Sequence, residues 1–367
     1  MTFVTMFPET QNVHLIKDVG MIPYIMHKEY GLDSKIVCYN NGEYPYIKNE
    51  VYGLKIDFIK KCTGKSVIDG ALYLLKNSKK IDILHLFHFS KRSAFWILIY
   101  KILNRHGKIY LKLDADYHIK SSMNPRKSNL KGYFKRKTLD RCNLISVENT
   151  NIYNFLKESW KIDVKLIPNG FYNNSERRNI YYKDKENIIL TVGRIGTYQK
   201  STEVLLDGFK LAYNDIKGWK LRIIGPVEDE FKSYLKKFFN ENPELKDNIE
   251  IVGEISDRKI LEDQYRKAKI FCLVSRYESF GLVFLEAMKL GCYIITSNVE
   301  SAIDITCNKQ YGDIFEIDDS NELSQLLIKN CNNERKILES SINIQNFVYK
   351  NFTWEKICKK ILDYLEI

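Results

Sequence analysis

The sequence lacks the features that mark membrane-spanning, secreted and zinc-binding proteins. No apolar run reaches about 18 residues, so no segment is predicted to span a bilayer. Its eight cysteines form no C-x-x-C pair and mostly lie in apolar company, which favours reduced thiols over disulfides or a zinc site. The amino terminus, MTFVTMFPETQ, has neither the cationic start nor the cleavage site of a signal peptide. These absences predict a cytoplasmic protein.

The composition supplies enough apolar material for two cores. The chain has 367 residues, of which 44% are hydrophobic and 28% are charged. Such values are typical of a soluble globular protein, and the length exceeds that of one ordinary domain. We therefore expect two domains.

Excess positive charge is confined to the first half of the chain. Residues 1–173 contain 28 Lys and Arg against 15 Asp and Glu, whereas the remainder contains 29 against 31. Many of these cations lie in NPRKSNLKGYFKRKTLDR, from Asn124 to Arg141. Either a solvated basic surface or a patch that meets a membrane leaflet or a nucleic acid explains this charge.

Short apolar runs alternate with helical stretches along the whole chain. TFVTMF, IDILHLF and KIYLKLD are typical of buried strands, and the same rhythm starts again with NIILTVGRI after the polar stretch Phe171–Asn187. This α/β alternation predicts two doubly wound domains, at residues 1–172 and 173–345, with ligands in the crevice outside the strand ends. Residues 346–367 are expected to form a carboxyl-terminal helix that packs back on the first domain.

The stretch SRYESFGLVFLEAMKLG, from Ser275 to Gly291, combines a loop, a helix and two carboxylates. Unpaired N–H groups where the helix starts suit a phosphate or a sugar oxygen. Glu278, just before them, is better suited to neutral hydroxyls than to phosphate. Glu286, two turns along the helix, either holds a vicinal diol such as ribose or shares an ordinary exposed strip with Lys289.

A second stretch, VGRIGTYQKSTEVLLDGF, places Arg194 and Lys200 six residues apart across a loop that also contains Gly193. An Arg fork and a Lys point charge on one loop can neutralise a diphosphate, although either could be a surface charge. Together with WKLRIIGP and IEIVGEIS, these segments resemble the nucleotide-sugar half of the GT-B glycosyltransferases, in particular family 4, the glycosyl transferases group 1. Order and spacing agree over residues 163–319, including the Glu-x7-Glu motif.

The resemblance implies a role for individual residues of the second domain. Arg194 and Lys200 would bind the donor diphosphate and act in catalysis with Glu278, which would contact the transferred sugar. Glu286 would hold the ribose. The remaining donor-side candidates would lie around the sugar, phosphate and base: Gly193, Glu254, Ile255, Phe280, Gly281, Leu282 and Val283.

The first domain matches the family less closely. Its first loop, PETQNVHLIKDVGMIP, offers only Gly20 as a counterpart of the family's glycines, and His14 could contact either substrate. His88 follows IDILHLF and is a candidate for the acceptor side. Asp114 and Asp116, in KIYLKLDADY, stand where many relatives have His-Asp. They could contact an acceptor hydroxyl, cap the chain, or hold a metal as Asp-x-Asp does in GT-A enzymes.

The resemblance implies a GT-B enzyme of the hexosyltransferase class (EC 2.4) with two facing Rossmann-like domains. It would transfer a sugar, with retention and without a metal or other cofactor, from a nucleotide-diphosphate sugar, UDP-sugar favoured, to a glycan or lipid-linked acceptor in cell-surface polysaccharide synthesis. Peripheral docking on the inner membrane face would use six cations: Arg126, Lys127, Lys131, Lys135, Arg136 and Lys137.

Three alternatives remain open. A GT-B nucleotide-sugar epimerase and an inactive GT-B binding partner would share the donor site. A nucleic-acid-binding protein would share the charge, but the sequence has no RNP, zinc-finger or helix-turn-helix signature.

Overall fold

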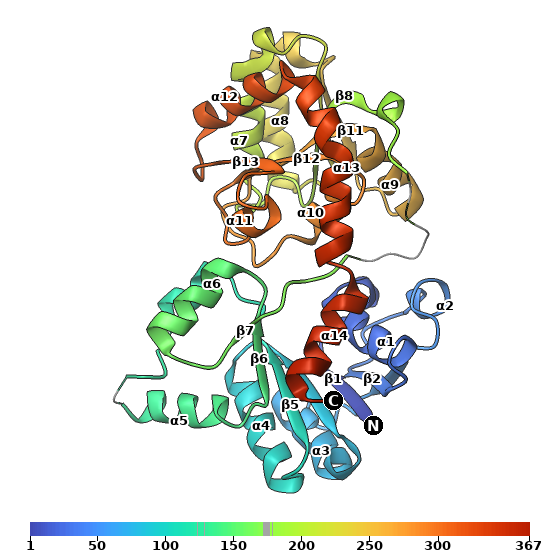
Figure 1. Cartoon of the computed structure of the whole chain (residues 1–367), viewed down its shortest axis with the longest axis vertical. Coiled ribbons are helices and arrows are strands. Elements are labelled where there is room, and N and C mark those ends of the chain that lie inside the picture. Colours follow the sequence, from blue (N-terminus) through green and yellow to red (C-terminus); the bar gives the residue numbers. More distant parts are fainter. Residues whose placement is uncertain (123, 128, 172–176, 178) are drawn as a thin grey trace. The chain divides into compact units, whose positions relative to one another are not determined.

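The computed structural model describes residues 1–122, 124–127, 129–171, 177 and 179–367. Two compact units make up the chain: Met1–Asn174 with Phe352–Ile367, and Ser175–Asn351 (Figure 1). Each is described by itself. The boundary expected from the sequence, between residues 172 and 173, falls among residues 172–176 and so lies outside the described residues.

Unit 1 is built on a seven-stranded sheet of order β3-β2-β1-β4-β5-β6-β7, in which every pair of neighbours is parallel. Strands β1 and β4 are fully or nearly fully buried because helices cover both faces, which explains their continuous apolar runs. The strands are β1 (Thr2–Met6), β2 (Asp33–Cys38), β3 (Lys55–Phe58), β4 (Ile83–Phe87), β5 (Lys108–Lys112), β6 (Leu144–Val147) and β7 (Lys165–Leu166).

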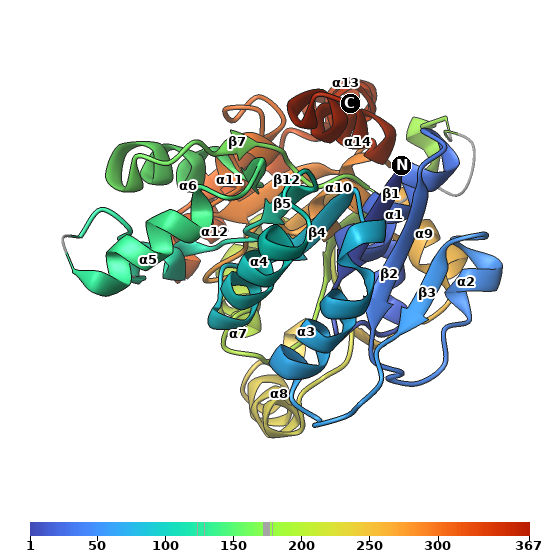
Figure 2. The same ribbon diagram turned by 90° about the horizontal axis from the view of Figure 1, so that it is seen from below.

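Helices α3 and α4 pack side by side on one face of this sheet, as Figure 2 shows, and α1 and α14 pack together on the other. Neighbouring residues of β1 point to opposite cores, Val4 towards α3 and α4 and Phe3 towards α1 and α14. The helices of unit 1 are α1 (Asp18–Lys28), α2 (Tyr46–Asn49), α3 (Ser66–Asn77), α4 (Lys91–Leu103), α5 (Leu130–Leu139), α6 (Thr150–Phe155) and α14 (Trp354–Leu365).

Unit 2 repeats the architecture with a six-stranded parallel sheet of order β10-β9-β8-β11-β12-β13. Its strands are β8 (Glu186–Val192), β9 (Lys220–Ile224), β10 (Ile249–Gly253), β11 (Ala268–Leu273), β12 (Tyr293–Ser297) and β13 (Gly312–Phe315). Its helices are α7 (Thr202–Ala212), α8 (Asp229–Glu241), α9 (Arg258–Lys267), α10 (Leu282–Met288), α11 (Ala302–Ile305), α12 (Ser320–Cys331) and α13 (Glu334–Asn351). Two doubly wound sheets confirm the predicted fold class.

The strand order reverses once in each sheet, between β1 and β4 in unit 1 and between β8 and β11 in unit 2. At such a point the connections leave a strand pair in opposite directions. The crevice that opens outside the carboxyl ends of the pair is where open α/β sheets bind ligands. The loops after these four strands are therefore the first places to look for a site.

The first loop of unit 1 differs from its prediction. A loop was expected as far as Pro23, but a 3-10 helix covers Asn12–Ile16 and α1 begins at Asp18. Pro23 suggests a break, since proline removes a backbone donor, yet it is accommodated inside α1. Gly20 accordingly lies in the first turn of α1, where a Cβ atom would come within 2.1 Å of the Leu15 carbonyl oxygen. Its absence of a side chain allows this close packing.

Helix α14 follows unit 2 in the chain but belongs to unit 1. Phe171 and Thr353 form an isolated parallel bridge just before it, and Trp354, its first residue, is buried. A Cβ atom at Gly170 would come within 2.7 Å of the Trp354 ring. The Tyr30 hydroxyl donates to the Glu355 carbonyl over 2.8 Å, and the Lys108 ammonium donates to the Leu365 carbonyl. The helix is thus fixed at both ends.

We predict that Trp354→Ala destabilises unit 1 by about 3–5 kcal/mol, because it opens a cavity where α14 starts. Tyr364→Ala on the same helix is the control, since Tyr364 is 44% exposed and should cost far less. Urea unfolding followed by circular dichroism measures both. Equal losses of stability in the two variants would contradict the anchoring role of Trp354.

Candidate functional site

The reversal point of unit 2 collects the donor-side candidates of the sequence. Gly193 and Arg194 follow β8, and Ser275 to Glu278 follow its hydrogen-bonded neighbour β11. Because both strands are parallel, their carboxyl ends meet at one edge of the sheet. Residues 81 positions or more apart in the chain are thereby brought to the same edge of the sheet.

Lys200 and Glu278 form an ion pair at this edge. Glu278 is only 7% exposed and also accepts a hydrogen bond from the Ser275 hydroxyl over 2.7 Å. Such partners are what a carboxylate removed from water requires. An ammonium has three donors, so Lys200 can keep Glu278 and still reach an anionic ligand. The pair is therefore held in position before any ligand arrives.

Arg194 lies on the rim of the same recess as Gly193 and Lys200. Its guanidinium donates to the Gln199 side chain over 3.0 Å, and that amide in turn donates to the Tyr277 carbonyl over 3.1 Å. The recess holds about 10 Å³, which is no more than one water molecule. A diphosphate would thus lie across the rim, against the exposed Arg194, and not inside the recess.

Arg276 connects the two loops, and sequence reasoning did not single it out. Its guanidinium pairs with Glu203 over 2.9 Å and with Asp318 over 2.9 Å, and it lies 4.3 Å from the centre of the Tyr198 ring. Its backbone N–H donates to the Gln199 carbonyl over 2.8 Å. The side chain and the backbone of Arg276 therefore both connect the Arg194–Lys200 loop to the loop after β11.

The turn into α10 has the conformation that its glycine permits. Gly281 has φ +77°, in the left-handed region, and its neighbour Phe280 is buried with its carbonyl accepting from the Ser301 hydroxyl over 2.8 Å. The backbone N–H of Glu278 points at Glu300, 3.4 Å away. The helix starts at Leu282, followed by Val283, and ends at Met288, with Lys289 as its C-cap. Gly291, at φ +73°, reverses the chain.

Glu286 points towards α9, where it accepts a hydrogen bond from the Tyr265 hydroxyl over 3.0 Å and faces Arg258 at 3.7 Å. Burial and then the nearby carboxylate raise the pKa of Tyr265, so this phenol remains a donor. Lys289 is buried and pairs with Glu262 at 3.3 Å. The alternative of an exposed strip shared by Glu286 and Lys289 is therefore wrong.

Glu254 and Ile255 form the loop between β10 and α9. Glu254 is exposed and Ile255 is partly buried. The loop leads directly into Arg258, the residue that faces Glu286. Helix α9 thus links this loop to the carboxylate expected to hold the ribose.

At the reversal point of unit 1, two candidate histidines meet at one aromatic ring. Phe7, just after β1, has the His14 ring 5.6 Å and the His88 ring 6.5 Å from its own centre. Burial, followed by Lys17, lowers the pKa of His14. His88 Nε2 lies 4.0 Å from the Asp114 carboxylate.

His88 and Asp114 both have positive φ, at 53° and 43°. Such conformations are costly for residues with side chains and cluster at functional sites. Asp116 has a different role: its carboxylate accepts from the N–H and from the ring of His118, both over 2.9 Å, and caps the turn Tyr117–Ser121. Asp116 is therefore the structural cap that the sequence allowed, whereas Asp114 faces His88. In the part of the chain that the structure describes, no three His, Cys, Asp or Glu side chains form a group that could hold a metal.

A buried charge cluster lies next to Asp114, and sequence reasoning missed it. Lys112, the last residue of β5, is 1% exposed and pairs with Glu148, after β6, and with Asp18, 3.2 Å away at the start of α1. These carboxylates raise the pKa of Lys112 despite its burial. Burial, and then the neighbouring Asp114 and Asp18, raise the pKa of Glu148 to about 7. Read along the sequence, Lys112 interrupts an apolar strand and carries no other signal.

The basic patch predicted for a membrane is centred on α5, but its six cations are not equivalent. Lys127, Lys131 and Lys137 are exposed. Arg126 donates to the carbonyl oxygens of Trp160 and Lys161 over 3.3 and 2.8 Å.

Lys135, counted in the patch, is turned inward. Its ammonium lies 3.7 Å from the centre of the Trp160 ring, and burial lowers its pKa to about 8. Lys135 is therefore only partly exposed, and its place in the membrane patch stays a prediction. A side chain of its length can cover apolar surface, and the sequence does not say which lysine will.

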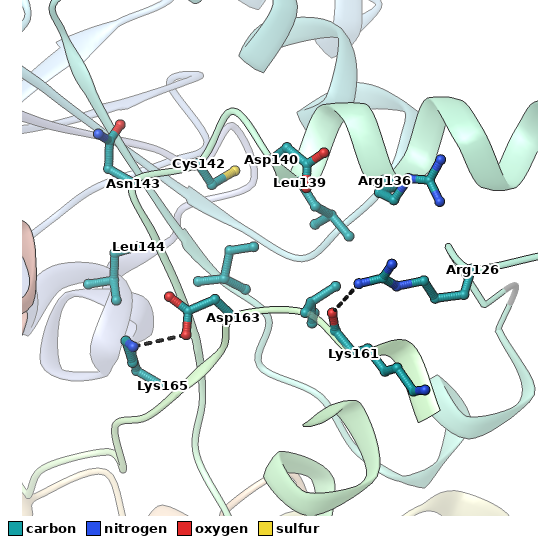
Figure 3. Close-up of a pocket in the computed structure, with 12 residues that line it drawn as sticks. Arg126, Arg136, Leu139, Asp140, Cys142, Asn143, Leu144, Lys161, Asp163 and Lys165 are labelled. Atoms are coloured by element: carbon teal, nitrogen blue, oxygen red, sulfur yellow. Dashed lines mark hydrogen bonds and ion pairs between the residues drawn. The ribbon is translucent and has the colours of Figure 1, made fainter. Parts of the chain in front are cut away.

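A pocket of about 250 Å³ opens beside this patch, between the end of α5 and residues 161–165 (Figure 3). Arg126 and Arg136 line it with Lys161 and Lys165, and Asp140 and Asp163 partly offset their charge. In Figure 3, Lys165 is held by Asp163, and Arg126 reaches the Lys161 carbonyl.

Helix α5 also exposes an apolar ridge, formed by Leu130, Tyr133 and Phe134. Their exposed fractions are 71%, 46% and 59%. Large apolar side chains interleaved with Lys131 and Lys137 are typical of a surface that meets an anionic lipid layer. None of the helices formed by the described residues combines the length and apolarity required to cross a bilayer.

Comparison with known proteins extends the resemblance noted in the sequence. Residues 173–351 match the family model of the glycosyl transferases group 1. An uncharacterized glycosyltransferase of Methanocaldococcus jannaschii, MJ1178, is 27% identical over 339 residues, which cover 89% of this chain and 87% of that protein. The capsular polysaccharide biosynthesis glycosyltransferase CapM of Staphylococcus aureus is 29% identical over 46% of this chain and 44% of its own length.

Solved glycosyltransferase structures share the fold over the whole chain. A glycosyltransferase from Rickettsia africae superposes with a TM-score of 0.76 at 17% identity, covering 100% of this chain and 97% of its own. HepE of Anabaena, solved with UDP and glucose, superposes with a TM-score of 0.73 at 13% identity, covering 100% and 99%. At such identities the likeness establishes the GT-B fold alone.

For the Lys200–Glu278 pair we predict a coupling free energy of about 1–3 kcal/mol, because the two partners are in contact and largely buried. A double-mutant cycle with Lys200→Met and Glu278→Gln, read by urea unfolding, measures it. The exposed Lys232–Asp229 pair on α8 is the control and should couple by less than about 0.5 kcal/mol. A coupling no larger at Glu278 than in the control would show that the pair is not preorganised.

Proposed function

We propose that this chain, a glycosyltransferase of the GT-B fold whose residues 173–351 match the family model of the glycosyl transferases group 1, transfers a sugar from a nucleotide-diphosphate sugar to an acceptor hydroxyl, with retention and without a metal. The observation that carries the proposal is the Lys200–Glu278 pair beside Arg194 at the reversal point of unit 2. The guanidinium of Arg194, the ammonium of Lys200 and the carboxylate of Glu278 thus lie together at the place where such folds bind ligands.

The donor contacts follow from charge and position. Arg194 and Lys200 would bind the diphosphate, and Glu278 would accept hydrogen bonds from the hydroxyls of the transferred sugar. Glu286, oriented by Tyr265, would hold the ribose. The other donor-side contacts would come from the loops after β8 and β10 and the turn into α10, at Gly193, Glu254, Ile255, Phe280, Gly281, Leu282 and Val283. Gly20, in the first turn of α1 in unit 1, stays a candidate donor-side residue.

UDP-sugar is the donor that we propose. Support comes from HepE, which shares the fold and was solved with UDP and with UDP-glucose. The acceptor that we propose is a glycan or lipid-linked saccharide of cell-surface polysaccharide synthesis. Two relatives are named for the biosynthesis of such polysaccharides. They are CapM and the amylovoran biosynthesis glycosyltransferase AmsD of Erwinia amylovora, which is 35% identical over 31% of this chain.

The reaction that we propose exchanges one C–O bond for another at the anomeric carbon. The bond from that carbon to the diphosphate breaks, and a bond to the acceptor oxygen forms on the same face. The acceptor proton passes to the departing phosphate oxygen. Arg194 and Lys200 stabilise the charge that develops on the leaving group, which is the main way in which these side chains lower the barrier.

We predict that Arg194→Ala, Lys200→Ala and Glu278→Gln each lower the rate of transfer by about 10²–10³, as is typical when one stabilising contact to a charged transition state is removed. Lys232→Ala, exposed on α8, is the control and should keep wild-type activity. A thermal-shift panel of UDP-, GDP- and ADP-sugars selects the donor first, since a ligand that binds the folded state raises its apparent stability.

Three outcomes of that assay would contradict the proposal. Near wild-type turnover in the three variants would discard the site. Conversion of the donor to an epimer without any acceptor would favour the nucleotide-sugar epimerase, and donor binding without turnover would favour an inactive binding partner.

We further propose that the protein is cytoplasmic and docks on the inner membrane face through α5. The exposed cations of the patch would meet anionic headgroups while the ridge of Leu130, Tyr133 and Phe134 enters the interface. Arg136, at the rim of the pocket in Figure 3, would contact a headgroup phosphate. The ridge explains why the patch would favour a membrane over a nucleic acid.

For this docking we predict that Lys131→Glu with Lys137→Glu weakens binding to vesicles of phosphatidylglycerol and phosphatidylcholine by about tenfold or more at low salt, since each cation near the surface contributes about 1 kcal/mol. Leu130→Ser with Phe134→Ser should weaken binding at high salt as well. Co-sedimentation measures both, with Ile102→Ser on α4, 75% exposed, as the apolar control. Equal partition of the wild type to neutral and anionic vesicles would reject the proposal.

A further inference from the structure

The last residue of β5 joins three other elements of unit 1. The Lys112 side chain reaches Asp18 at the start of α1 and Glu148 after β6, and its carbonyl accepts the backbone N–H of His88, after β4, over 2.8 Å. One buried lysine thus connects the carboxyl ends of β4, β5 and β6 to α1.

The same cluster reaches the segment that carries Asp114. The second oxygen of Glu148 accepts the backbone N–H of Ala115 over 3.2 Å, and the Leu113 carbonyl lies 3.2 Å from His88 Nδ1. Asp114 is between these two anchored residues and has a positive φ. The Glu148 side chain therefore fixes the backbone after Asp114, whereas main-chain hydrogen bonds from Leu113 to Ser146 and from His88 to Lys112 fix the backbone before it and the neighbouring loop.

Stability alone does not account for these charges. Replacing a buried ion cluster by apolar residues of the same volume is often neutral or stabilising, because desolvation offsets the attraction. Another buried lysine of this chain shows the contrast: Lys185 in unit 2 donates to the carbonyls of Ala268 and Leu290, each over 2.7 Å. Lys185 ties main-chain segments together, whereas Lys112 orients two carboxylates, one of which holds the Ala115 amide.

The side chains of His88 and Asp114 are accessible to solvent. His88 and Asp114 keep 48% and 30% of their side-chain surface exposed, whereas Lys112 and Glu148 behind them keep 1% and 0%, and Asp18 keeps 12%. A ring nitrogen and a carboxylate 4.0 Å apart can together accept and donate hydrogen bonds to a hydroxyl group. The buried charge cluster thus lies directly behind the two exposed polar side chains, His88 and Asp114.

We propose that Asp18, Lys112 and Glu148 are positioning residues that hold His88 and Asp114 in one arrangement for the acceptor hydroxyl. The inference rests on the proposed transfer reaction and adds to it the residues that set acceptor binding. None of the three contacts a substrate. Glu148 acts through the Ala115 amide, Lys112 holds the Glu148 carboxylate, and Asp18 pairs with Lys112. Their loss therefore changes acceptor binding and leaves donor binding in unit 2 unaltered.

The experiment compares Glu148→Ala with Glu148→Gln in the full chain. Glutamine keeps the oxygen that accepts the Ala115 N–H, whereas alanine removes it. With UDP-glucose as donor and octyl β-glucoside as acceptor, Glu148→Ala should raise the acceptor KM about tenfold and leave the donor KM within about twofold, since misplacing a contact weakens only the ligand it serves. Glu148→Gln should recover most of the loss. Lys185→Met is the matched control, expected to lower stability with the ratio of the two KM values unchanged.

A second measurement reads the arrangement without turnover. Histidine-selective NMR should show the His88 signal displaced in Glu148→Ala, close to wild type in Glu148→Gln, and unchanged in Lys185→Met. If Glu148→Ala does not fold, Asp18→Asn takes its place with a KM rise of about threefold, because one of the two carboxylates remains.

The outcomes separate the two proposals. A wild type that transfers no sugar from UDP-glucose counts against the proposed function, and the His88 signal then still tests the positioning. A wild type that transfers while the variants keep a normal acceptor KM, or raise both KM values together, overturns the positioning role and leaves the proposed function standing. An undisplaced His88 signal overturns it as well.

Discussion

A carboxylate removed from water needs a cation or several hydrogen-bond donors, and in both units this requirement is met where parallel strands end. Glu278 meets it with Lys200 and Ser275, and Glu148 meets it with Lys112 and the Ala115 amide. Each pairing fixes a loop as well as a charge. The loops that carry the candidate ligand contacts are thus ordered by the same interactions that make burial of the acid possible.

Much of the fold could be predicted from the sequence because parallel strands covered on both faces read as continuous apolar runs. IDILHLF became β4 and NIILTV became the interior of β8, and the number of strands and their alternation with helices then determine the fold class. Pro23 was misleading, since its effect depends on whether the surrounding packing tolerates a missing donor, and that packing is not local.

The candidate site, like the fold, was predictable from the sequence only in part. Glu278 and Glu286 could be found from their spacing on one short segment, but the partners that hold them could not. Glu203 and Asp318 are 73 and 42 residues from Arg276, and Glu148 is 36 residues from Lys112. Pairings at such separations follow from sheet order, which a single sequence does not encode locally. The basic charge of α5 was visible in the composition, whereas the exposure of Phe134 and the burial of Lys135 depend on how the helix is rotated against its neighbours.

The place of α14 in the chain has a consequence for biosynthesis. The helix completes a core whose other members lie in residues 1–174, yet it is translated after all of unit 2. While the ribosome is still making unit 2, the surface of α1 that α14 will cover remains open, and Leu15, Ile22 and Ile25 lack their final neighbours. Unit 2 is one continuous segment of the chain, whereas unit 1 becomes complete only when α14 has left the exit tunnel. The face of α1 that α14 covers is therefore exposed throughout the synthesis of unit 2.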